Sequence, residues 1–426
     1  MMRVLLTFLY NFLIILAFPV VWMVAVINKK LRGSLAGQRE LWFVLDRFKA
    51  KRASDPRPVI WLHAASAGEF EQLQPVLDRL RQRSVLIFQT FTSSTIYYKA
   101  FTDKRFDGVA YLPWDLPWRV NRFVKRLTPD LFINTRHDLW PNLLLTLRRR
   151  GIRSIFINAN LYPDSLRLKP WFRGVNRWIF SNLSAVYTIS DSVSGLLQNL
   201  YDGPLQVSGD TRFDRVAERA ARNAGQLIPN SVIGKRPVVI YGSVLPSDLD
   251  VVVPAIVDSL KIRDALHVIV PHETRERDLT PWEVALFRRR LKAVRYSELD
   301  RYRGESVLIW NSVGQLADLY THATLAYVGA GFGAGVHSVT EPAIYQVPAA
   351  HGPSYQILAE AVDLVTLGIS TVVQTGADLA KWLELLDQPD ELKQKRDALA
   401  LFVAERVGAT DRILTSEQDF LPSPAN

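Results

Sequence analysis

The sequence contains no cysteine among its 426 residues and only seven histidines. The lack of cysteine excludes disulfide bonds, iron–sulfur clusters, thiolate metal sites and thiol nucleophiles. With so few imidazoles a zinc enzyme is disfavoured, and no metal or cofactor is expected. Hydrophobic residues make up 48% of the chain and charged residues 22%, which excludes wholesale disorder and a multi-span membrane protein. A chain of this length predicts two or three folded domains.

The net charge of +10 comes from one segment. Residues 104–177 contain fifteen Lys and Arg but only five Asp and Glu, and the rest of the chain is balanced. A basic field of this kind attracts anionic partners, namely nucleic acid, acidic lipid headgroups or phosphorylated substrates. The alternative is a basic surface that only keeps the protein soluble.

A long hydrophobic run stands at the N-terminus. Residues 4–27 carry no formal charge. As a helix they would be about 36 Å long, against a hydrocarbon layer of about 30 Å. No small-residue cleavage site follows, so we expect an uncleaved membrane anchor over residues 1–28. One basic residue precedes the run and several follow it, which predicts that the main body lies on the cytoplasmic side of the membrane. A helix lying in the membrane interface and a cleaved signal peptide are the alternatives.

Beyond the anchor, short β-branched runs alternate with amphipathic stretches, which is typical of parallel sheets covered by helices. The first set of predicted strands comprises residues 59–63, 85–90, 108–112, 131–134, 155–158, 185–189 and 205–207. The second set comprises residues 238–241, 266–270, 307–309, 325–328, 349–351 and 371–373. We therefore expect an α/β protein with two doubly wound Rossmann-like domains, residues 29–225 and 226–426. Their strand carboxyl ends should face a ligand-binding cleft.

In the first motif, a predicted strand runs into small residues and then into a helix that Glu69 opens. Ser66 and Glu69 have the spacing of a capping box, in which both side chains satisfy the first helical N–H groups. The functional alternative is that Glu69, held at the positive end of a helix, stays ionised and acts as a general base.

A second strand ends at Gly242 and Ser243, before a helix start with Asp248 and Asp250. Backbone N–H groups and the Ser243 hydroxyl could hold one phosphate there. A plain helix start with acids in its first turn is the alternative. The two aspartates alone make only a weak metal-binding motif.

The densest glycine run spans residues 329–341. Gly329 to Ala334 formally satisfy G-x-G-x-x-A, a fingerprint of nicotinamide and flavin enzymes. That fingerprint requires an acidic residue about 20 positions later, where this sequence reads Pro-Ala-Ala-His, and it usually opens the first βαβ unit. We therefore favour a loop that lets a nucleotide or sugar approach the backbone, with Glu341 accepting hydrogen bonds from hydroxyls.

Five motifs occur in the order of one known family, at residues 63–69, 138–142, 209–214, 242–243 and 331–341. Together they resemble the 3-deoxy-D-manno-octulosonic acid (Kdo) transferases, over nearly the whole chain and including the N-terminal anchor. The resemblance implies the GT-B fold and transfer of Kdo from CMP-Kdo to an anionic lipid A precursor at the inner membrane. It implies no cofactor, metal or nucleic acid.

The resemblance also implies residue roles. Glu69 matches the family's catalytic base, and Arg212 stands where the family has a basic residue, usually Lys, that stabilises developing charge. The implied acceptor-binding residues are Ser66, Gly68, Asp138 and Trp140. The implied donor-binding residues are Gly242, Ser243, Pro271, His272, Val313, Gly314, Gln315, Gly331, His337, Ser338 and Glu341.

Several positions depart from the family pattern. The family's Glu-Thr-Glu reads Arg136-His137-Asp138 here, Asn160 replaces an arginine, and Pro-Arg-His is reduced to Pro271-His272. The base and the cation are retained, so we expect the reaction class to hold while the exact sugar and acceptor stay open. The alternatives are a UDP-sugar transferase, a Rossmann oxidoreductase and a non-catalytic lipid-binding homologue.

A lipid-contacting face is the last prediction. Residues 171–180 interleave the aromatic side chains of Trp171, Phe172, Trp178 and Phe180 with arginines. Such a pattern suits contact with an anionic lipid surface, and the alternative is an ordinary helical core.

Overall fold

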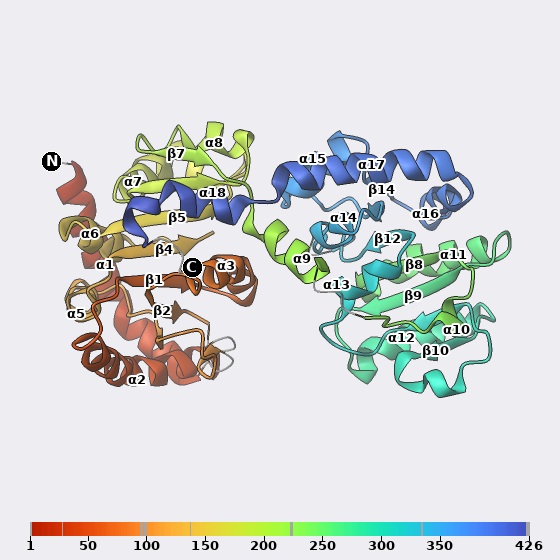
Figure 1. The fold of residues 1–426 in the computed structure, drawn as a ribbon, viewed down its shortest axis with the longest axis horizontal. Coiled ribbons are helices and arrows are strands. Elements are labelled where there is room, and N and C mark those ends of the chain that lie inside the picture. Colours follow the sequence, from red (N-terminus) through yellow and green to blue (C-terminus); the bar gives the residue numbers. More distant parts are fainter. Residues whose placement is uncertain are drawn as a thin grey trace. The chain divides into compact units, whose positions relative to one another are not determined.

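The computed structural model describes residues 2–27, 29–93, 97, 100–136, 138–221, 225–333 and 335–422 (Figure 1). The chain forms two compact units, one of residues 1–215 with 407–426 and one of residues 216–406. Each unit holds one seven-stranded parallel sheet with helices on both faces, so the predicted α/β class is confirmed.

The first sheet has the order β3-β2-β1-β4-β5-β6-β7. Its strands are β1 (Val59–Ala64), β2 (Leu86–Phe91), β3 (Gly108–Tyr111), β4 (Leu131–Thr135), β5 (Arg153–Ala159), β6 (Ala185–Thr188) and β7 (Leu205–Val207). The helices of this unit are α1 (Met2–Ile27), α2 (Lys29–Arg52), α3 (Ala67–Leu80), α5 (Pro117–Leu127), α6 (Pro141–Arg149), α7 (Pro170–Phe180), α8 (Asp191–Leu197) and α18 (Ala409–Ser416). The winding reverses between β1 and β4, and such a switch point is where doubly wound sheets bind ligands.

The second sheet has the order β10-β11-β9-β8-β12-β13-β14. Its strands are β8 (Val238–Val244), β9 (Leu266–Pro271), β10 (Ala293–Arg295), β11 (Val307–Ile309), β12 (Leu325–Val328), β13 (Ala349–His351) and β14 (Thr371–Val372). The helices are α10 (Asn230–Ile233), α11 (Leu249–Leu260), α12 (Glu276–Arg288), α13 (Leu316–Leu319), α14 (Thr340–Ile344), α15 (Ala359–Thr366), α16 (Gly376–Trp382) and α17 (Pro389–Arg406). Here the switch point lies between β8 and β12.

The strands follow the sequence pattern closely. Every predicted strand is present with small shifts at its ends, because strands buried on both faces read as continuous β-branched runs. The prediction missed β10, a three-residue edge strand that is only partly buried.

The unit boundaries differ from the predicted domains in two places. The first boundary lies at residue 215, inside α9 (Thr211–Ala221), and not at residue 225. The last twenty residues, predicted for the second domain, belong to the first unit. The helical periodicity of α9 runs through the boundary without a break, so the sequence carries no linker signal there.

Buried polar contacts hold the returning C-terminal segment to the first unit. The carboxylate of Asp214 accepts hydrogen bonds from the backbone N–H groups of Gly408 and Thr410, at 2.6 and 2.7 Å. The buried Glu417 accepts a hydrogen bond from the Tyr187 hydroxyl at 2.5 Å and also pairs with an arginine of β5. Such contacts join distant residues and leave no periodic pattern in the sequence.

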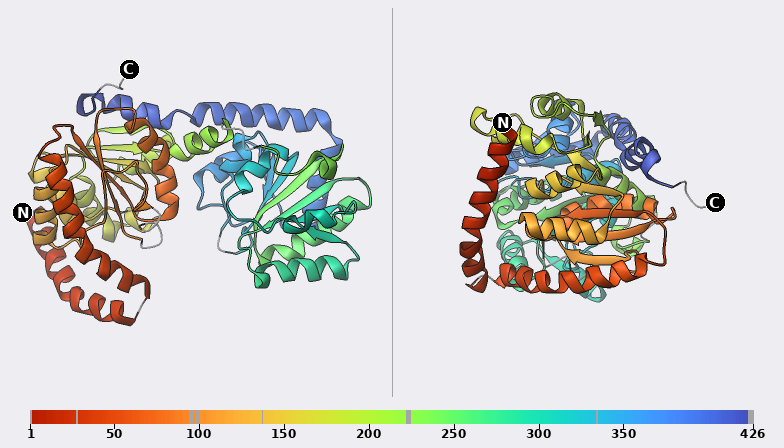
Figure 2. Two further views of the ribbon diagram at one scale, coloured as in Figure 1. Left: turned by 60° about the horizontal axis from the view of Figure 1, so that its bottom comes forward. Right: turned by 90° about the vertical axis from the view of Figure 1, so that its left-hand side faces the viewer.

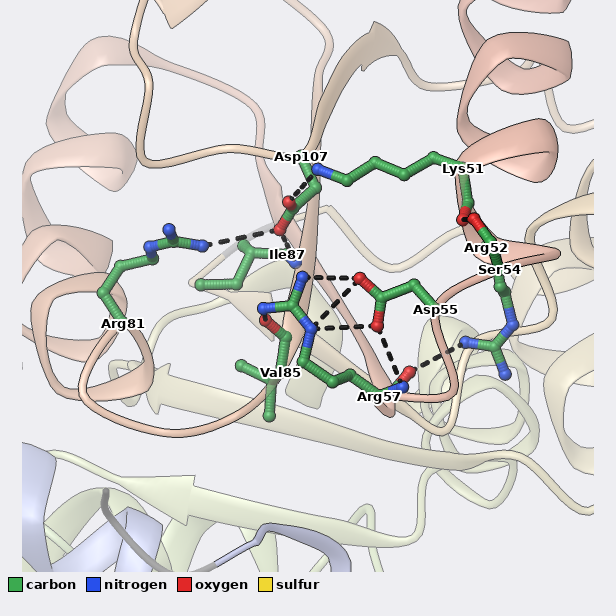
Figure 3. A network of polar contacts seen from close by, with 9 residues as sticks. All are labelled: Lys51, Arg52, Ser54, Asp55, Arg57, Arg81, Val85, Ile87 and Asp107. Carbon is green, nitrogen blue, oxygen red and sulfur yellow. Dashed lines mark hydrogen bonds and ion pairs between the residues drawn. The ribbon is translucent and has the colours of Figure 1, made fainter. Parts of the chain in front are cut away.

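Ion pairs hold the C-terminal end of α2 against the first sheet, near the amino ends of its strands (Figure 3). Asp107 accepts hydrogen bonds from Lys51 Nζ at 2.6 Å and from the Ile87 backbone N–H at 2.8 Å. Arg57 pairs with Asp55 at 2.6 Å in the same network. These contacts lie at the edge of the sheet opposite to the switch-point loops, so we assign them a structural role.

Helix α1 contains the predicted anchor. Its stretch Arg3–Val24 has a mean hydropathy of 2.4 and is long and apolar enough to cross a membrane. Most of its large apolar side chains are exposed, including Phe8 at 69% and Leu16 at 63%. Asn28, the last residue of the predicted anchor, lies outside the described residues.

One face of α1 is docked on the first unit (Figure 2). The Tyr10 hydroxyl donates a hydrogen bond to Asp115 Oδ2 at 2.8 Å, and the Asn142 amide donates one to Asn11 Oδ1 at 2.8 Å. Further along, the Phe18 ring packs edge-on against a tryptophan, with a centroid separation of 4.6 Å. The helix therefore lies along the folded body for much of its length.

Candidate active site

Glu69 lies in the first turn of α3, directly after β1 at the switch point of the first sheet. The Ser66 hydroxyl accepts a hydrogen bond from the Glu69 N–H at 3.3 Å, and Glu69 Oε2 accepts one from the Ala65 N–H at 2.6 Å. The predicted Ser66 cap is therefore present, but the Glu69 carboxylate bonds to the N–H of Ala65, before the cap, and not to that of Ser66. An ionised carboxylate has about four acceptor positions, so this bond leaves capacity for a substrate proton. Glu69 is only 4% exposed, whereas Ser66 and Gly68 beside it are exposed.

Burial raises the pKa of Glu69 above its ordinary value. The hydrogen bond from Ala65 opposes this shift, the negative charge of Asp138 adds to it, and the charges of His63 and Arg136 oppose it. A carboxylate with a raised pKa is a stronger base than an exposed one, which suits proton abstraction near neutral pH.

Asp138 follows β4 on the other side of the switch point and collects three donors. His63 Nε2 lies 3.3 Å from its Oδ2, and the Thr92 hydroxyl and Trp140 Nε1 donate to the same oxygen at 3.0 and 3.3 Å. Burial acts to raise the pKa of Asp138, but these hydrogen bonds hold it below its ordinary value. The structure thus brings together Asp138 and Trp140, two predicted acceptor-binding residues, around a half-buried negative charge.

Arg212 lies at the start of α9 and is held by a buried carboxylate. Its Nη2 donates to Asp210 Oδ2 at 2.9 Å, and its backbone N–H donates to Oδ1 at 2.8 Å. Gln72 of α3 donates to the same carboxylate at 2.9 Å. Burial acts to raise the pKa of Asp210, but Arg212 keeps it below its ordinary value. A cation is therefore fixed in the first turn of α9.

Arg136 and Asn158, which no sequence motif marked as site residues, lie in the same region. Arg136 follows β4 in a left-handed conformation with φ of 65°, and its charge acts on both Glu69 and Asp210. The Asn158 amide donates to Thr211 Oγ1 at 2.9 Å, which ties the end of β5 to the start of α9. Arg136 was visible only as a departure from a family pattern, and the contacts of Asn158 gave no sequence signal.

In the second unit, a cavity of about 290 Å³ lies at the switch point between β8 and β12. Six predicted donor-binding residues line it: Gly242, Ser243, Gly314, His337, Ser338 and Glu341. The other five lining residues were not predicted from the sequence: Arg219, Leu316, Ala317, Tyr320 and Val328. The apolar ones belong to a short helix and a buried strand, which carry no sequence motif.

Arg219 shapes the wall of this cavity. Its guanidinium donates to both carboxylate oxygens of Asp318, at 2.8 and 2.6 Å, and to the Gly314 carbonyl at 2.6 Å. Gly314 has φ of 85°, a conformation that glycine adopts without strain. The arginine thereby fixes the loop before α13.

His337 contributes an imidazole to the cavity lining. Burial and the neighbouring His272 lower the pKa of His337, so its ring is neutral near pH 7. The two rings stack with centroids 4.5 Å apart. Within the described residues, His337 Nε2 is buried and has no hydrogen-bond partner. The cavity lining therefore includes the imidazole of His337, the hydroxyls of Ser243, Ser338 and Tyr320, and the carboxylate of Glu341.

The other predicted donor-binding residues, which the structure describes, do not line this cavity. Val313 is 80% exposed, and His272 reaches the cavity only through its stacking on His337. A Cβ on Gly331 would lie 2.5 Å from the Gly352 nitrogen, so this glycine lets two backbone segments meet. Pro271 ends β9, and Gln315 precedes α13.

A second glycine of the run also allows two backbone segments to pack closely. A Cβ on Gly329 would lie 2.5 Å from the Ser243 carbonyl oxygen, because the segment after β12 touches the carboxyl end of β8. An irregular segment, and not a helix, follows β12 before α14. Ala334, which completes the dinucleotide fingerprint, lies outside the described residues.

Asp248 is a structural anchor. It is fully buried, and its carboxylate accepts hydrogen bonds from the backbone N–H groups of Leu245 and Ala330, at 2.7 and 3.0 Å, and from the Tyr327 hydroxyl at 2.8 Å. These contacts occupy both oxygens. Within the described part of the chain, no group of three or more His, Asp or Glu side chains is placed to hold a metal ion.

The predicted lipid-contacting aromatic residues divide into two pairs. Trp171 is 88% exposed and Phe172 is 49% exposed at the start of α7. Trp178 and Phe180 are buried, so they belong to the core. Only the first pair is available for contact with a lipid.

Comparison with known proteins completes the description of the site. Residues 43–215 match the family model described as 3-Deoxy-D-manno-octulosonic-acid transferase (kdotransferase). The chain is 25% identical over 408 residues to the 3-deoxy-D-manno-octulosonic acid transferase of Bordetella pertussis, covering 90% of this chain and 93% of the relative. It is 26% identical over 434 residues to that of Chlamydophila psittaci, covering 98% and 97%. Among solved structures, MurG of Acinetobacter baumannii matches with a TM-score of 0.54 at 14% identity, covering 85% of this chain and all of that one. This likeness concerns the fold alone, and the GT-B fold is confirmed.

Proposed function

We propose that this protein, a glycosyltransferase of the Kdo transferase family, transfers Kdo from CMP-Kdo to a phosphorylated lipid A precursor. The observation that carries the proposal is the similarity to the Kdo transferases of Bordetella pertussis and Chlamydophila psittaci, over at least nine tenths of this chain and of each of these two relatives. The cavity in the second unit supports it. Ligand pockets span roughly 300 to 1,000 Å³, and a cavity of about 290 Å³ suits one nucleotide better than a dinucleotide.

In this proposal the cytidylate binds in the cavity of the second unit. Its phosphate lies against the Ser243 hydroxyl and the backbone at the carboxyl end of β8, where Ser243 has a left-handed φ of 52°. The ribose hydroxyls donate hydrogen bonds to Glu341, and His337 Nε2 pairs with a polar atom of the nucleotide. A single phosphate can be held by hydroxyl and backbone N–H groups without a metal ion.

The reaction is a single displacement with inversion. A hydroxyl oxygen of the acceptor forms a bond to the anomeric carbon of Kdo, and the bond from that carbon to the phosphate oxygen of CMP breaks. The hydroxyl proton passes to Glu69, whose raised pKa strengthens it as a base. CMP departs with the bonding electron pair, and Glu69 then releases its proton to solvent.

Arg212 supplies a fixed positive charge in the same proposal. The Kdo donor carries a carboxylate, and charge grows on the leaving phosphate as the bond breaks. A preorganised cation stabilises such charge without reorganising during the reaction. Asp210 supports this role, because its two contacts with Arg212 restrict the position of the guanidinium.

We further propose that α1 lies in the membrane interface, along the body of the first unit, on the cytoplasmic side of the inner membrane. The docked face around Tyr10 and Asn11 supports this orientation over a perpendicular span. The basic segment then faces an acidic surface, where each cation contributes about 1 kcal/mol of attraction. Trp171 and Phe172 are exposed for lipid contact.

The activity should fall at acidic pH with a midpoint above the ordinary range of a glutamate. Glu69 works only when ionised, and burial raises its pKa, so the active form is lost as pH falls through this raised value. The measurement is kcat/KM for the donor across the pH range in wild type. A profile that stays flat down to the ordinary pKa of glutamate would contradict this prediction.

CMP should raise the melting temperature of the protein, whereas UDP and NAD should not. A ligand that binds only the folded state stabilises it by mass action. In the His337→Ala variant, about ten-fold more CMP should be needed for the same rise in melting temperature, because the variant loses one hydrogen-bonding group in the cavity. Protection by UDP would favour a UDP-sugar transferase, and protection by NAD would favour an oxidoreductase. Binding of CMP without any turnover would favour a non-catalytic homologue.

A further inference from the structure

A second polar cavity, of about 480 Å³, lies where α1 meets α5 and α6 in the first unit. All three helices contribute to its walls. Its polar lining includes Thr7, Asn11, Asn121, Thr146, Arg149 and Arg150. In the part of the chain that the structure describes, no acidic side chain lines it.

The polar residues of α1 are concentrated on the side that faces this cavity. Asn11 bonds to Asn142, and Tyr10 bonds to Asp115 beside it. Polar groups within a lipid-facing helix are unfavourable unless they are paired or have a function. Leu5 and Phe8, on other faces of the same turns, are 64% and 69% exposed. The helix thus places a polar cavity directly beside an apolar surface.

The charge in the cavity favours an anion. Arg149 and Arg150 stand at the end of α6, and Arg150 Nη2 donates to Asn121 Oδ1 at 2.7 Å, which holds its guanidinium at the cavity wall. The nearby carboxylate of Asp115 accepts hydrogen bonds from the Asn142 and Leu143 N–H groups, each at 2.9 Å. Asp115 is therefore engaged elsewhere, and guanidinium groups match the geometry of a phosphate.

We propose that this cavity binds the headgroup phosphate of an anionic membrane phospholipid, whose acyl chains lie along the exposed apolar face of α1. The proposal rests on the interfacial position of α1 proposed above and not on the transfer reaction. The cavity extends along α6 from Asn142 to Arg150. Its two arginines stand at the far end of α6, about 12 Å of helical rise from Asn142, so in this proposal the lipid phosphate is distinct from an acceptor at Trp140. A lipid held here would join α1 to the body of the enzyme.

Native mass spectrometry of the full-length protein in detergent tests this inference. The protein is titrated with phosphatidylglycerol or with phosphatidylcholine, and the fraction that retains a lipid is measured. We expect one phosphatidylglycerol to be retained and phosphatidylcholine to be lost. The double variant Arg149→Gln/Arg150→Gln should bind phosphatidylglycerol about 30-fold more weakly, as expected from the loss of two phosphate-binding cations.

The matched control is Lys104→Gln/Lys169→Gln, which removes the same charge from exposed positions that do not line the cavity. It should retain phosphatidylglycerol like wild type. Equal retention of both lipids by wild type, or equal loss in the two double variants, would overturn the proposal. Two further results together would also overturn the proposal. They are competition between phosphatidylglycerol and a lipid A precursor for binding, and a raised KM for the acceptor in the variant Arg149→Gln/Arg150→Gln. The cavity would then be an acceptor site. The binding of phosphatidylglycerol is measured separately from Kdo transfer, so a protein without transfer activity should still retain this lipid.

Discussion

Replacing Glu69 with Gln should lower turnover by about 10²- to 10⁴-fold, the range that general-base catalysis contributes. The glutamine carbonyl can still accept the hydrogen bond that Glu69 takes from the Ala65 N–H, so the cap of α3 and the fold should persist. The proton acceptor alone is lost. The measurement is the rate of CMP release from CMP-Kdo in the presence of acceptor, with the melting temperature recorded for each variant.

Glu71→Gln is the matched control, because Glu71 lies on the same helix, is exposed and pairs with Arg215 at 3.1 Å. This variant should keep near wild-type turnover. A folded Glu69→Gln variant with wild-type turnover would remove Glu69 from the mechanism.

Replacing Arg212 with Gln should lower kcat by about 10²- to 10³-fold, the effect of losing one group that stabilises transition-state charge. Arg212→Lys should recover most of the rate, because it restores the positive charge near Asp210. The comparison also controls for stability, since the glutamine leaves the buried carboxylate of Asp210 without its cation. The readouts are kcat, donor KM and melting temperature.

Arg215→Gln serves as the control on the same helix. Its partner Glu71 is exposed, so the loss of that pair should have little effect on stability or turnover. If Arg212→Gln and Arg212→Lys kept the same rate as wild type, the fixed cation would have no part in the reaction.

The sequence predicted the two sheets because their strands are buried on both faces and read as continuous apolar runs. It placed Glu69 and the Gly242–Ser243 turn after strands that proved to flank the two switch points. These residues are recognisable because small and polar residues directly after a buried strand are typical of a binding site and are not needed for the fold. Six of the predicted donor residues do line one cavity.

The contacts that complete the sites were not predictable from local pattern. Arg136 acts on Glu69 and Asp210 through space, and the Asn158 amide bonds to Thr211, 53 positions away. Arg219 is one of several arginines on α9, and only its contact with Asp318 distinguishes it. The glycine at position 331 correctly signalled a close approach, but the approaching group is the backbone of Gly352.

The docking of α1 on the body was also invisible in the sequence. Hydropathy identifies a segment that can enter a bilayer, but it does not distinguish a perpendicular span from a helix that lies along the protein. Tyr10 and Asn11 make that distinction, since each bonds to a residue of the folded body. Tyr10 and Asn11 interrupt the apolar run in the sequence, but only their bonds to Asp115 and Asn142 show that this face is docked.

The most direct test of the account is a transfer assay with the purified full-length protein, CMP-Kdo and a lipid A precursor in mixed micelles. We expect the glycolipid to gain the mass of Kdo while an equal amount of CMP is released. If CMP-Kdo stays intact and the glycolipid mass is unchanged under conditions in which the protein is folded, the proposed reaction is contradicted.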